Sequence, residues 1–362
     1  MLKCYAKHNT DLAQVQYVLP TRSLVKFKVT TVAYKMADSS NTSSSGKELT
    51  FRLASHRDYD AVMSISEGIY GDRDYLPAFY HAYIDDPDVT VFLAMAGEQV
   101  VGLRASKIME SGTAFITKAA RVAPEWRGQG VDRQLTLHQD TWVRRNCPKV
   151  KYKRSVTFAD TPMSESMKRN MHYIFNLPFV GYQCSPDLWW RQDPAQLAQL
   201  EPTGLPDVVP LQDADDDFCT AVQKWLPARA CGGYDGKPII LVDWEPYTLS
   251  PTNLKRLQKQ STLFALKHEG ESSLSIVTTY PAAAGMQLCI DVYAKTFPTW
   301  KKHVLKHLHD ASRTSKSDNI CAKMFVGLFE LEDSIHDFCR DTLKMDAFYE
   351  SRIRADVFEL KL

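Results

Sequence analysis

Hydrophobic spacing predicts a regular alternation of strands and helices that begins at residue 49. The first strand is followed by a segment in which Val62, Ile65 and Ile69 recur at helical spacing. The expected strands are short apolar runs at 49–53, 89–94, 100–107, 114–122 and 150–157. The expected helices cover residues 58–70, 131–145 and 164–175. The predicted order is therefore strand, helix, three strands of an antiparallel meander, helix, strand and helix.

A proline-rich stretch without clean periodicity predicts a domain boundary between Gln192 and Asp213. Beyond it, strands are expected at 239–243, 262–267, 273–279 and 287–292, with helices at 253–260 and 299–311. Their order loosely repeats the first half, without sequence self-similarity. We therefore predict an α/β protein of mixed, α+β sheet type, with one domain at 49–200 and a degenerate copy of it at 205–362.

The polar, serine-rich composition of residues 36–47 predicts a flexible N-terminal segment at 1–48, with Met36 as a possible alternative start. Lys and Arg total 44 against 43 for Asp and Glu, so no global field favours nucleic acid or an anionic membrane. Eight singly scattered cysteines and the lack of a long apolar run predict a reduced, cytoplasmic, membrane-free protein. The oligomeric state stays open.

A glycine-rich turn after the strand at 114–122 carries the strongest chemical signal. Gly128 and Gly130 allow a tight turn at the start of a helix, where free N–H groups and the helix dipole favour an anion. Glycine needed for turn geometry alone is the competing explanation. A P-loop is excluded because no Gly-Lys-Ser or Gly-Lys-Thr follows, and a Rossmann turn would not follow a meander.

The motif Val122-x-Pro124-x-x-Arg127-Gly128-x-Gly130 resembles the acetyl-CoA motif of the GNAT superfamily, and the element order resembles that fold. The resemblance implies an acetyl-CoA-dependent N-acetyltransferase without a metal. It assigns pyrophosphate binding to the backbone amides of Arg127, Gly128, Gln129, Gly130 and Val131. It assigns pantetheine pairing to Arg121, Val122 and Ala123, and polarisation of the thioester carbonyl to the N–H near Val122.

Three longer stretches, at 68–77, 121–124 and 240–254, resemble the histidine N-acetyltransferase family, which acetylates the α-amine of free histidine. Histidine or a related amino acid is then the expected acceptor. Tyr70, Asp74 and Tyr75 form an aromatic and acidic group suited to an imidazole and an ammonium, although they also suit a solvated loop. Alternatives are a catalytically degenerate acyl-CoA or metabolite-binding protein, and an acetyltransferase for peptide N-termini or polyamines.

Two positions depart from these patterns. Asp132 replaces the glycine or alanine that usually ends the motif, and a carboxylate about 5 Å from pyrophosphate would cost about 3 kcal/mol at a dielectric of 20. Lys118 occupies the place of a family glutamate, which leaves the general base open. Tyr173, expected on the last helix of the first half, is the candidate proton donor to the leaving thiolate, or simply a core aromatic.

Two groups of residues in the second half are predicted to have structural and not catalytic roles. Asp243, Trp244 and Tyr247 are expected to pack the two halves together rather than to close over the substrate. His303 and His307 share helical spacing among lysines, which predicts a solvated basic face rather than a metal site.

Overall fold

The computed structural model describes residues 48–66, 68–224, 226, 233–234, 236–268, 271–348 and 352–362. The flexible segment and the alternative start predicted before Glu48 lie outside these residues. Within the described part of the chain, no helix is both long and apolar enough to cross a bilayer.

The first half contains the predicted strands and helices together with two further elements, α2 and β6. Its elements are β1 (Leu49–Leu53), α1 (Tyr59–Ser64), α2 (Leu76–Asp85), β2 (Val89–Ala96), β3 (Gln99–Met109), β4 (Ala114–Val122), α3 (Val131–Asn146), β5 (Tyr152–Phe158), α4 (Pro162–Asn170) and β6 (His172–Cys184).

Two predicted helices end earlier than expected. The helix predicted at 58–70 ends at Ser64, and a separate helix, α2, begins at Leu76. Tyr70 and Asp72 have positive φ angles of 56° and 65°, which a helix cannot contain. The helix predicted at 164–175 ends at Asn170, because the aromatic and branched residues that follow enter strand β6.

The second half repeats the same layout. Its main elements are α6 (Asp216–Gln223), β8 (Ile239–Val242), β9 (Glu245–Thr248), α7 (Pro251–Leu257), β10 (Thr262–His268), β11 (Glu271–Ala282), β12 (Gly285–Tyr293), α8 (Phe297–Thr314), β13 (Ile320–Phe325), α9 (Glu332–Asp337) and β15 (Ile353–Lys361). The shorter elements are α5 (Trp189–Gln192), β7 (Val209–Pro210) and β14 (Asp346–Ala347).

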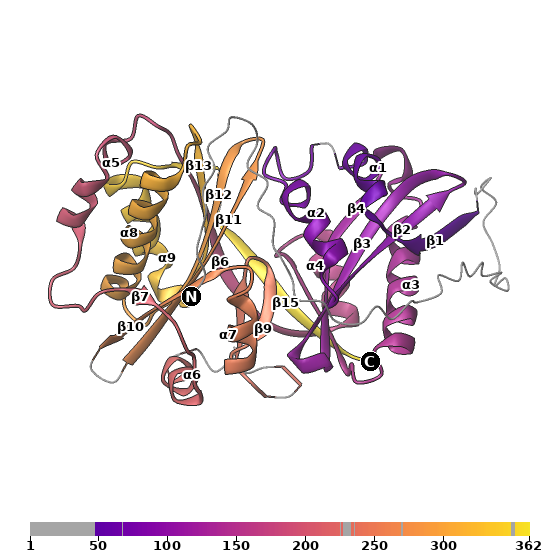
Figure 1. The fold of residues 1–362 in the computed structure, drawn as a ribbon. Helices are drawn as coiled ribbons and strands as arrows, with labels where there is room; N and C mark the ends of the chain where they lie inside the picture. Colours follow the sequence, from indigo (N-terminus) through magenta and orange to yellow (C-terminus); the bar gives the residue numbers. More distant parts are fainter. Residues whose placement is uncertain are drawn as a thin grey trace, which may run out of the picture.

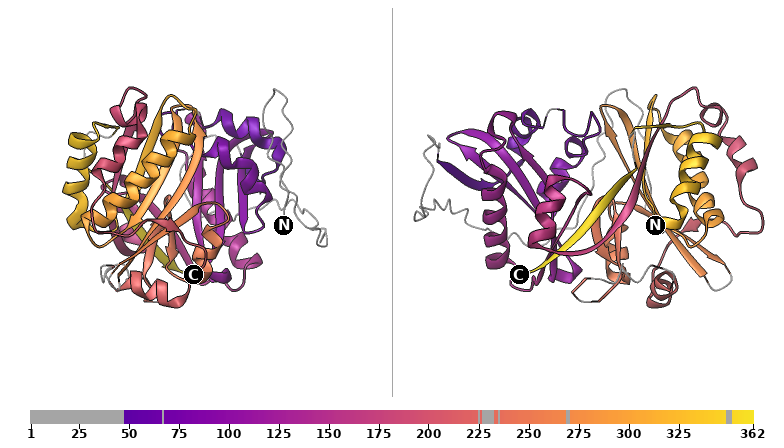
Figure 2. Two further views of the ribbon diagram at one scale, coloured as in Figure 1. Left: turned by 60° about the vertical axis from the view of Figure 1, so that its left-hand side comes forward. Right: turned by 180° about the vertical axis from the view of Figure 1, so that it is seen from behind.

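The two halves exchange their last strands within one continuous sheet. The strand order is β1-β2-β3-β4-β5-β15-β6-β13-β12-β11-β10-β7. Strand β15, at the end of the chain, pairs antiparallel with β5 of the first half, while β6 pairs antiparallel with β13 of the second half. Figures 1 and 2 show β6 and β15 running together between the halves. A cut near residue 200 would therefore remove β15 from beside β5 and β6 from beside β13, so each half would lose the strand that the other half contributes.

Helices cover both faces of the sheet in each half. In the first half, α1 and α2 pack on one face through Val62, Leu76 and Tyr80. Helix α3 packs on the opposite face through Val131 and Leu135, against Gly102 of β3. A Cβ at Gly102 would lie 2.9 Å from Leu135, so the glycine allows the helix to approach closely.

The face of α8 predicted to be solvated is buried instead. His303 is fully buried and His307 is 3% exposed. Both rings bond to serines of β11, since Ser275 Oγ lies 2.7 Å from His303 Nδ1 and 2.8 Å from His307 Nε2. The strand supplies a polar partner for each imidazole, which lets a histidine occupy a core position.

Candidate functional site

Strands β4 and β5 separate near the middle of the first half. They pair in parallel only from Ala114 opposite Tyr152 to Ile116 opposite Arg154. The backbone pairing ends there, although the next side chains still meet, with Thr117 Oγ1 and Ser155 Oγ 3.0 Å apart. The open edge of β4 beyond this point, up to Val122, leaves backbone groups that no neighbouring strand uses.

The backbone of Val122 points into this gap between β4 and β5. The Ala123 amide donates to Val101 of β3 at 3.0 Å. Because successive amides of a strand alternate in direction, the N–H of Val122 faces the opposite edge, where β5 has diverged. The Val122 carbonyl, on that same edge, accepts from Arg127 Nε at 3.1 Å. The N–H of Val122 therefore faces the gap.

A β-bulge in β4 marks the side of the gap that faces α1 and α2. The register with β3 shifts between Leu103 and Ala105, and Ala119 has a positive φ of 54°. The Ala119 amide donates to the Tyr75 hydroxyl at 3.0 Å. Burial raises the pKa of Tyr75 to about 12, so this hydroxyl keeps its proton at neutral pH. Non-glycine residues in left-handed conformations are concentrated at functional sites.

The glycine turn presents unused amides at the start of α3. Gly128 and Gly130 have φ angles of 75° and 77°, which glycine adopts without strain. Within the described residues, no group accepts from the amides of Gly128, Gln129 or Gly130, and the first helical amides from Val131 have no partner within the helix. A Cβ at either glycine would meet no atom within 4 Å, so the turn is open.

Asp132 is neutralised by an arginine beneath α3. Its carboxylate lies 2.5 Å from Arg104 Nη2 of β3. The Arg104 side chain is only 9% exposed, against 36% for Asp132. The pairing draws the carboxylate toward the sheet and offsets its charge beside the turn, so the repulsion considered from the sequence is reduced.

Among the described residues of the second half, the strands that correspond to β4 and β5 show neither the gap nor the glycine turn. Strands β12 and β13 pair in parallel from Met286 to Cys289, and a further bridge joins Val292 to Val326. The register between β11 and β12 runs without a shift, so there is no bulge. Residues 294–296, before α8, contain no glycine. These strands remain together where β4 and β5 separate.

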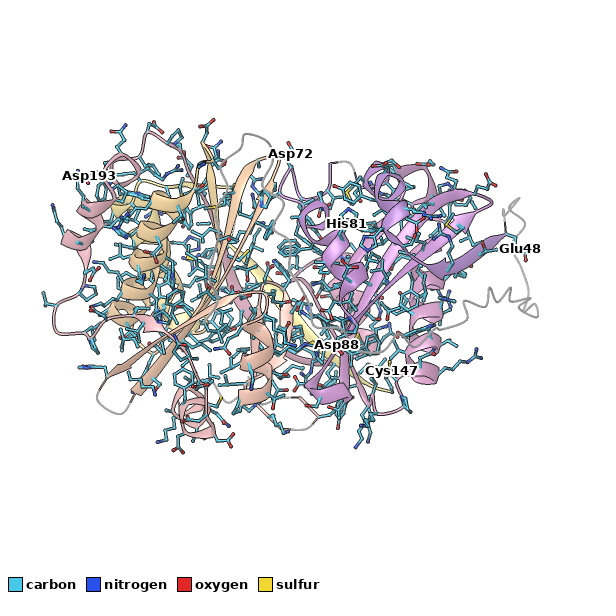
Figure 3. The ribbon with its side chains drawn as sticks, in the orientation of Figure 1. Glu48, Asp72, His81, Asp88, Cys147 and Asp193 are labelled. Atoms are coloured by element: carbon cyan, nitrogen blue, oxygen red, sulfur yellow. The ribbon has the colours of Figure 1, made fainter. Side chains whose placement is uncertain are left out.

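The three residues predicted to bind substrate lie together with Arg121. Arg121 Nη2 lies 2.7 Å from Asp74 Oδ1. The guanidinium carbon lies 5.3 Å from the ring centre of Tyr70 and 5.5 Å from that of Tyr75. Figure 3 marks Asp72, on the same loop, beside the hairpin of β11 and β12, where its carbonyl accepts from Ala284 at 2.8 Å. The loop therefore lies at the junction of the halves.

Lys118, where the resemblance to the family predicts a glutamate, is paired across the same junction. Its ammonium donates to Glu245 Oε1 of β9 and lies 4.4 Å from the Tyr83 ring centre. Lys107 Nζ lies 2.8 Å from Glu245 Oε2 and 2.9 Å from the Tyr247 hydroxyl. Three charged groups are thus buried together between the two halves.

The charges of this cluster are fixed by their mutual contacts. Burial disfavours the ammonium of Lys118, but Glu245 together with Tyr83 and Tyr75 outweighs burial and raises the pKa of Lys118 well above its usual value. Burial disfavours the carboxylate of Glu245, but Lys107 and Lys118 together lower its pKa below the usual range. Lys118 therefore keeps its proton at neutral pH, and the carboxylate of Glu245, with its pKa lowered by two lysines, is a weak base.

The residues expected to pack the halves together differ in their surroundings. Trp244 packs against Phe158 of β5, Phe179 of β6 and Phe325 of β13, with ring centres 4.6, 5.0 and 5.1 Å away. Tyr247 is fully buried. Asp243 Oδ1 instead accepts from the Cys289 thiol at 3.3 Å, and burial raises the pKa of this aspartate.

Tyr173 lies on strand β6 and not on a helix. Its side chain is 40% exposed, and its ring meets Phe358 of β15 edge to face at 5.8 Å. Strand β15 lies between β6 and β5, so Tyr173 is two strands away from the open edge of β5. Among the described residues, no group of three or more histidine, cysteine or acidic side chains is arranged to hold a metal ion.

Sequence reasoning missed Arg104, Lys107 and Glu245. Arg104 and Lys107 lie in an apolar strand, where a buried charge is unusual unless it is paired. Two charged residues in an apolar strand could therefore have been used to predict buried ion pairs at Arg104 and Lys107. The partner of Lys107 and Lys118 was not predictable in the same way, because Glu245 lies 127 residues beyond Lys118.

Comparison with known proteins agrees with this geometry. Residues 236–326 match the family described as "Histidine N-acetyltransferase, C-terminal". The histidine N-acetyltransferase of Xenopus tropicalis is 27% identical over 272 residues, covering 72% of this chain and 81% of that protein. That of Oreochromis niloticus is 25% identical over 323 residues, covering 83% and 90%.

A solved structure supports the two-domain arrangement. A tandem GNAT protein from the clavulanic acid biosynthesis pathway superposes with a TM-score of 0.51 at 13% identity, covering 87% of this chain and 98% of that one. This likeness shows the fold. The chain has the fold of that tandem GNAT protein and is similar in sequence to histidine N-acetyltransferases, and these relatives support an N-acetyltransferase enzyme.

Proposed function

We propose that this protein transfers an acetyl group from acetyl-CoA to the α-amine of a small amino acid, histidine or a close relative. The observation that carries the proposal is the gap between β4 and β5, with the free amides of the glycine turn at one end and the Ala119 bulge at the other. The second half, in which the equivalent strands stay paired, serves as an internal comparison.

The residues of the turn fit the charge of acetyl-CoA. Free amides at Gly128, Gln129, Gly130 and Val131 would receive the pyrophosphate, where the positive end of the α3 dipole also favours an anion. The edge of β4 from Arg121 to Ala123 would pair with the amide groups of pantetheine. Arg127, held against the Val122 carbonyl, would keep the turn in register with the strand.

Acetyl-CoA would supply an activated thioester, and the chain's part is to position it and stabilise developing charge. The Val122 N–H, on the open edge of β4, would donate to the thioester carbonyl oxygen. One such donor in a site shielded from water stabilises a developing oxyanion by about 3 kcal/mol. The amine forms the new C–N bond, the C–S bond breaks, and the CoA thiol is released.

The proton of the acceptor amine needs an acceptor other than Lys118. Lys118 keeps its proton, and the lowered pKa of Glu245 makes its carboxylate a weak base, so we assign this proton to neither side chain. An α-amine with a pKa near 8 is partly neutral at pH 7, and we propose that water removes its proton. Tyr173 on β6 is our candidate for protonating the leaving thiolate, and Tyr173→Phe tests this role.

A binding protein without turnover is the second candidate, favoured by the pairing of Lys118 with Glu245, which leaves neither side chain as an effective general base. Thiol release from acetyl-CoA, followed with histidine and with other amines, separates the two candidates. Turnover that depends on histidine supports the transferase. Saturable acetyl-CoA binding with no amine-dependent thiol release supports the binding protein.

A further inference from the structure

We infer that Asp74 and Arg121 form a receptor for the charged backbone of an amino acid, with Arg121 Nε contacting the carboxylate and Asp74 Oδ2 contacting the α-ammonium. The inference rests on the proposed function and names how its acceptor is recognised. It makes the substrate class a free amino acid that carries both charges, rather than an amine in general.

The carboxyl group of Asp74 uses only one of its two oxygens within the described residues. Oδ1 accepts from Arg121 Nη2 at 2.7 Å and from the Leu76 amide at 3.0 Å. Oδ2 is buried and has no hydrogen-bond partner. An ionised carboxylate is a strong acceptor at both oxygens. A cationic donor is therefore the group that would best occupy the unused Oδ2.

The guanidinium of Arg121 has one donor, Nε, without an acceptor among the described residues. Its side chain is 1% exposed, and its Nη1 and Nη2 donate to the Ala120 carbonyl and to Asp74. Its Nε is buried without an acceptor among the described residues. A buried ion pair that leaves one strong donor and one strong acceptor unused is poorly built for stability alone.

These two open positions suit opposite charges. A carboxylate prefers the planar donor edge of a guanidinium, and an ammonium prefers a carboxylate oxygen. An amino acid carries both groups one carbon apart, matching a donor and an acceptor on two side chains that touch. A polyamine has no carboxylate for Arg121, and a peptide N-terminus has an amide in its place.

The pair lies beside the point where transfer is proposed. Asp74 directly precedes Tyr75, whose hydroxyl accepts from Ala119 at the bulge, and Arg121 follows two residues after Ala119. Tyr70 is 51% exposed and stacks on Tyr75 at 6.3 Å, so it separates the guanidinium from solvent. Movement of one exposed tyrosine would therefore open the pair to a substrate.

The first test varies the substrate and leaves the full-length protein unchanged. Acetyl transfer is measured with L-histidine, with histamine, which lacks the carboxylate, and with L-histidine methyl ester, which hides its charge. We expect kcat/KM to fall about 10- to 100-fold for both analogues, as for a lost charged hydrogen bond. Equal kcat/KM for histidine and histamine would overturn the inference.

The second test pairs the substrate change with a protein change. Arg121→Gln should lower kcat/KM for histidine to about the wild-type value for histamine, and should change the histamine value by less than about threefold. Because this variant leaves Asp74 buried alone, Asp74→Asn with Arg121→Gln provides a version without an unpaired charge. Arg340→Gln, which removes an exposed arginine paired with Asp337 and Asp341, is the matched control.

Direct binding separates failure of this inference from failure of the proposed function. Acetyl-CoA affinity, measured by calorimetry, should be the same in all the variants. An equal loss with histidine and histamine, at unchanged acetyl-CoA affinity, would show that the pair is only structural. If no amine is acetylated, the proposed function fails, and the receptor then stands only if wild-type protein binds L-histidine and the double variant does not.

Discussion

The ammonium of Lys118, on strand β4, donates to the carboxylate of Glu245, on strand β9, and so joins the first half of the chain to the second. Glu245 also accepts from Lys107, which lies on β3 beside β4. The lysine that replaces a family glutamate is therefore not an isolated charge. The second half supplies the carboxylate that neutralises this lysine.

Glu245→Gln should destabilise the protein by about 3 kcal/mol, since it leaves Lys107 and Lys118 buried without a counter-charge. Urea unfolding followed by tryptophan fluorescence measures the change. Glu125→Gln, which alters an exposed glutamate whose carboxylate accepts from Gln99 Nε2, provides the control. A loss below about 0.5 kcal/mol would show that the lysines find other partners.

The contribution of Glu245 should depend on pH in a defined direction. Its pKa is lower in the folded state than the usual value of 4.5, so the folded state binds fewer protons at this group. The stabilisation is present above about pH 4.5 and is lost as the pH falls through the folded pKa. The stability difference between wild type and Glu245→Gln should therefore be constant from pH 5 to 7 and shrink below about pH 4.

Gly130→Glu should raise the acetyl-CoA KM by at least about 10-fold, because it places a negative charge beside the proposed pyrophosphate position. The change also forces a side chain into a left-handed conformation, which costs about 1 to 2 kcal/mol. Gly204→Glu is the matched control, since Gly204 has a φ of 79° and open space around its Cβ, in a loop outside the site. An equal KM in both variants would remove the turn from the acetyl-CoA site.

Asp132→Asn should change acetyl-CoA affinity by no more than about threefold, because Arg104 already offsets the carboxylate. Stability should fall by about 1 kcal/mol, a value discounted for the partial exposure of Asp132. Calorimetric titration and urea unfolding provide the two readings. Affinity that rises more than about 10-fold would mean that the carboxylate faces the pyrophosphate.

The chain should bind one acetyl-CoA and not two. The second half keeps β12 and β13 paired through the Val292 to Val326 bridge, so it offers no open strand edge to pantetheine. Titration calorimetry or native mass spectrometry gives the stoichiometry. Two equivalent sites per chain would contradict the comparison between the halves.

Local patterns were sufficient to predict the turn and most of the elements that support it. The strand at 114–122 and the helix from Val131 were identified because apolar spacing and glycine spacing are properties of short segments. Strand β6 was missed, since its start at His172 follows α4 after a single residue and carries no turn signal. The exchange of β6 and β15 was also missed, because strand pairing over such distances leaves no local trace.

The candidate site was likewise predictable in its local motifs and not in its long-range contacts. The sequence predicted the glycine turn as an anion site and the loop with Tyr70, Asp74 and Tyr75 as a substrate site. It did not predict which residues these groups contact. The pairing of Asp74 with Arg121 joins residues 47 apart, and that of Asp132 with Arg104 joins residues 28 apart. Such pairs depend on the packing of helix on sheet, which residue spacing along the chain does not specify.

Thiol release from acetyl-CoA, followed with purified full-length protein and L-histidine, tests the central claim most directly. The account predicts saturable release that depends on histidine, with N-acetylhistidine formed in equal amount and the rate reduced in Gly130→Glu but not in Gly204→Glu. Acetyl-CoA binding without release across histidine, related amino acids, peptides and polyamines would contradict it.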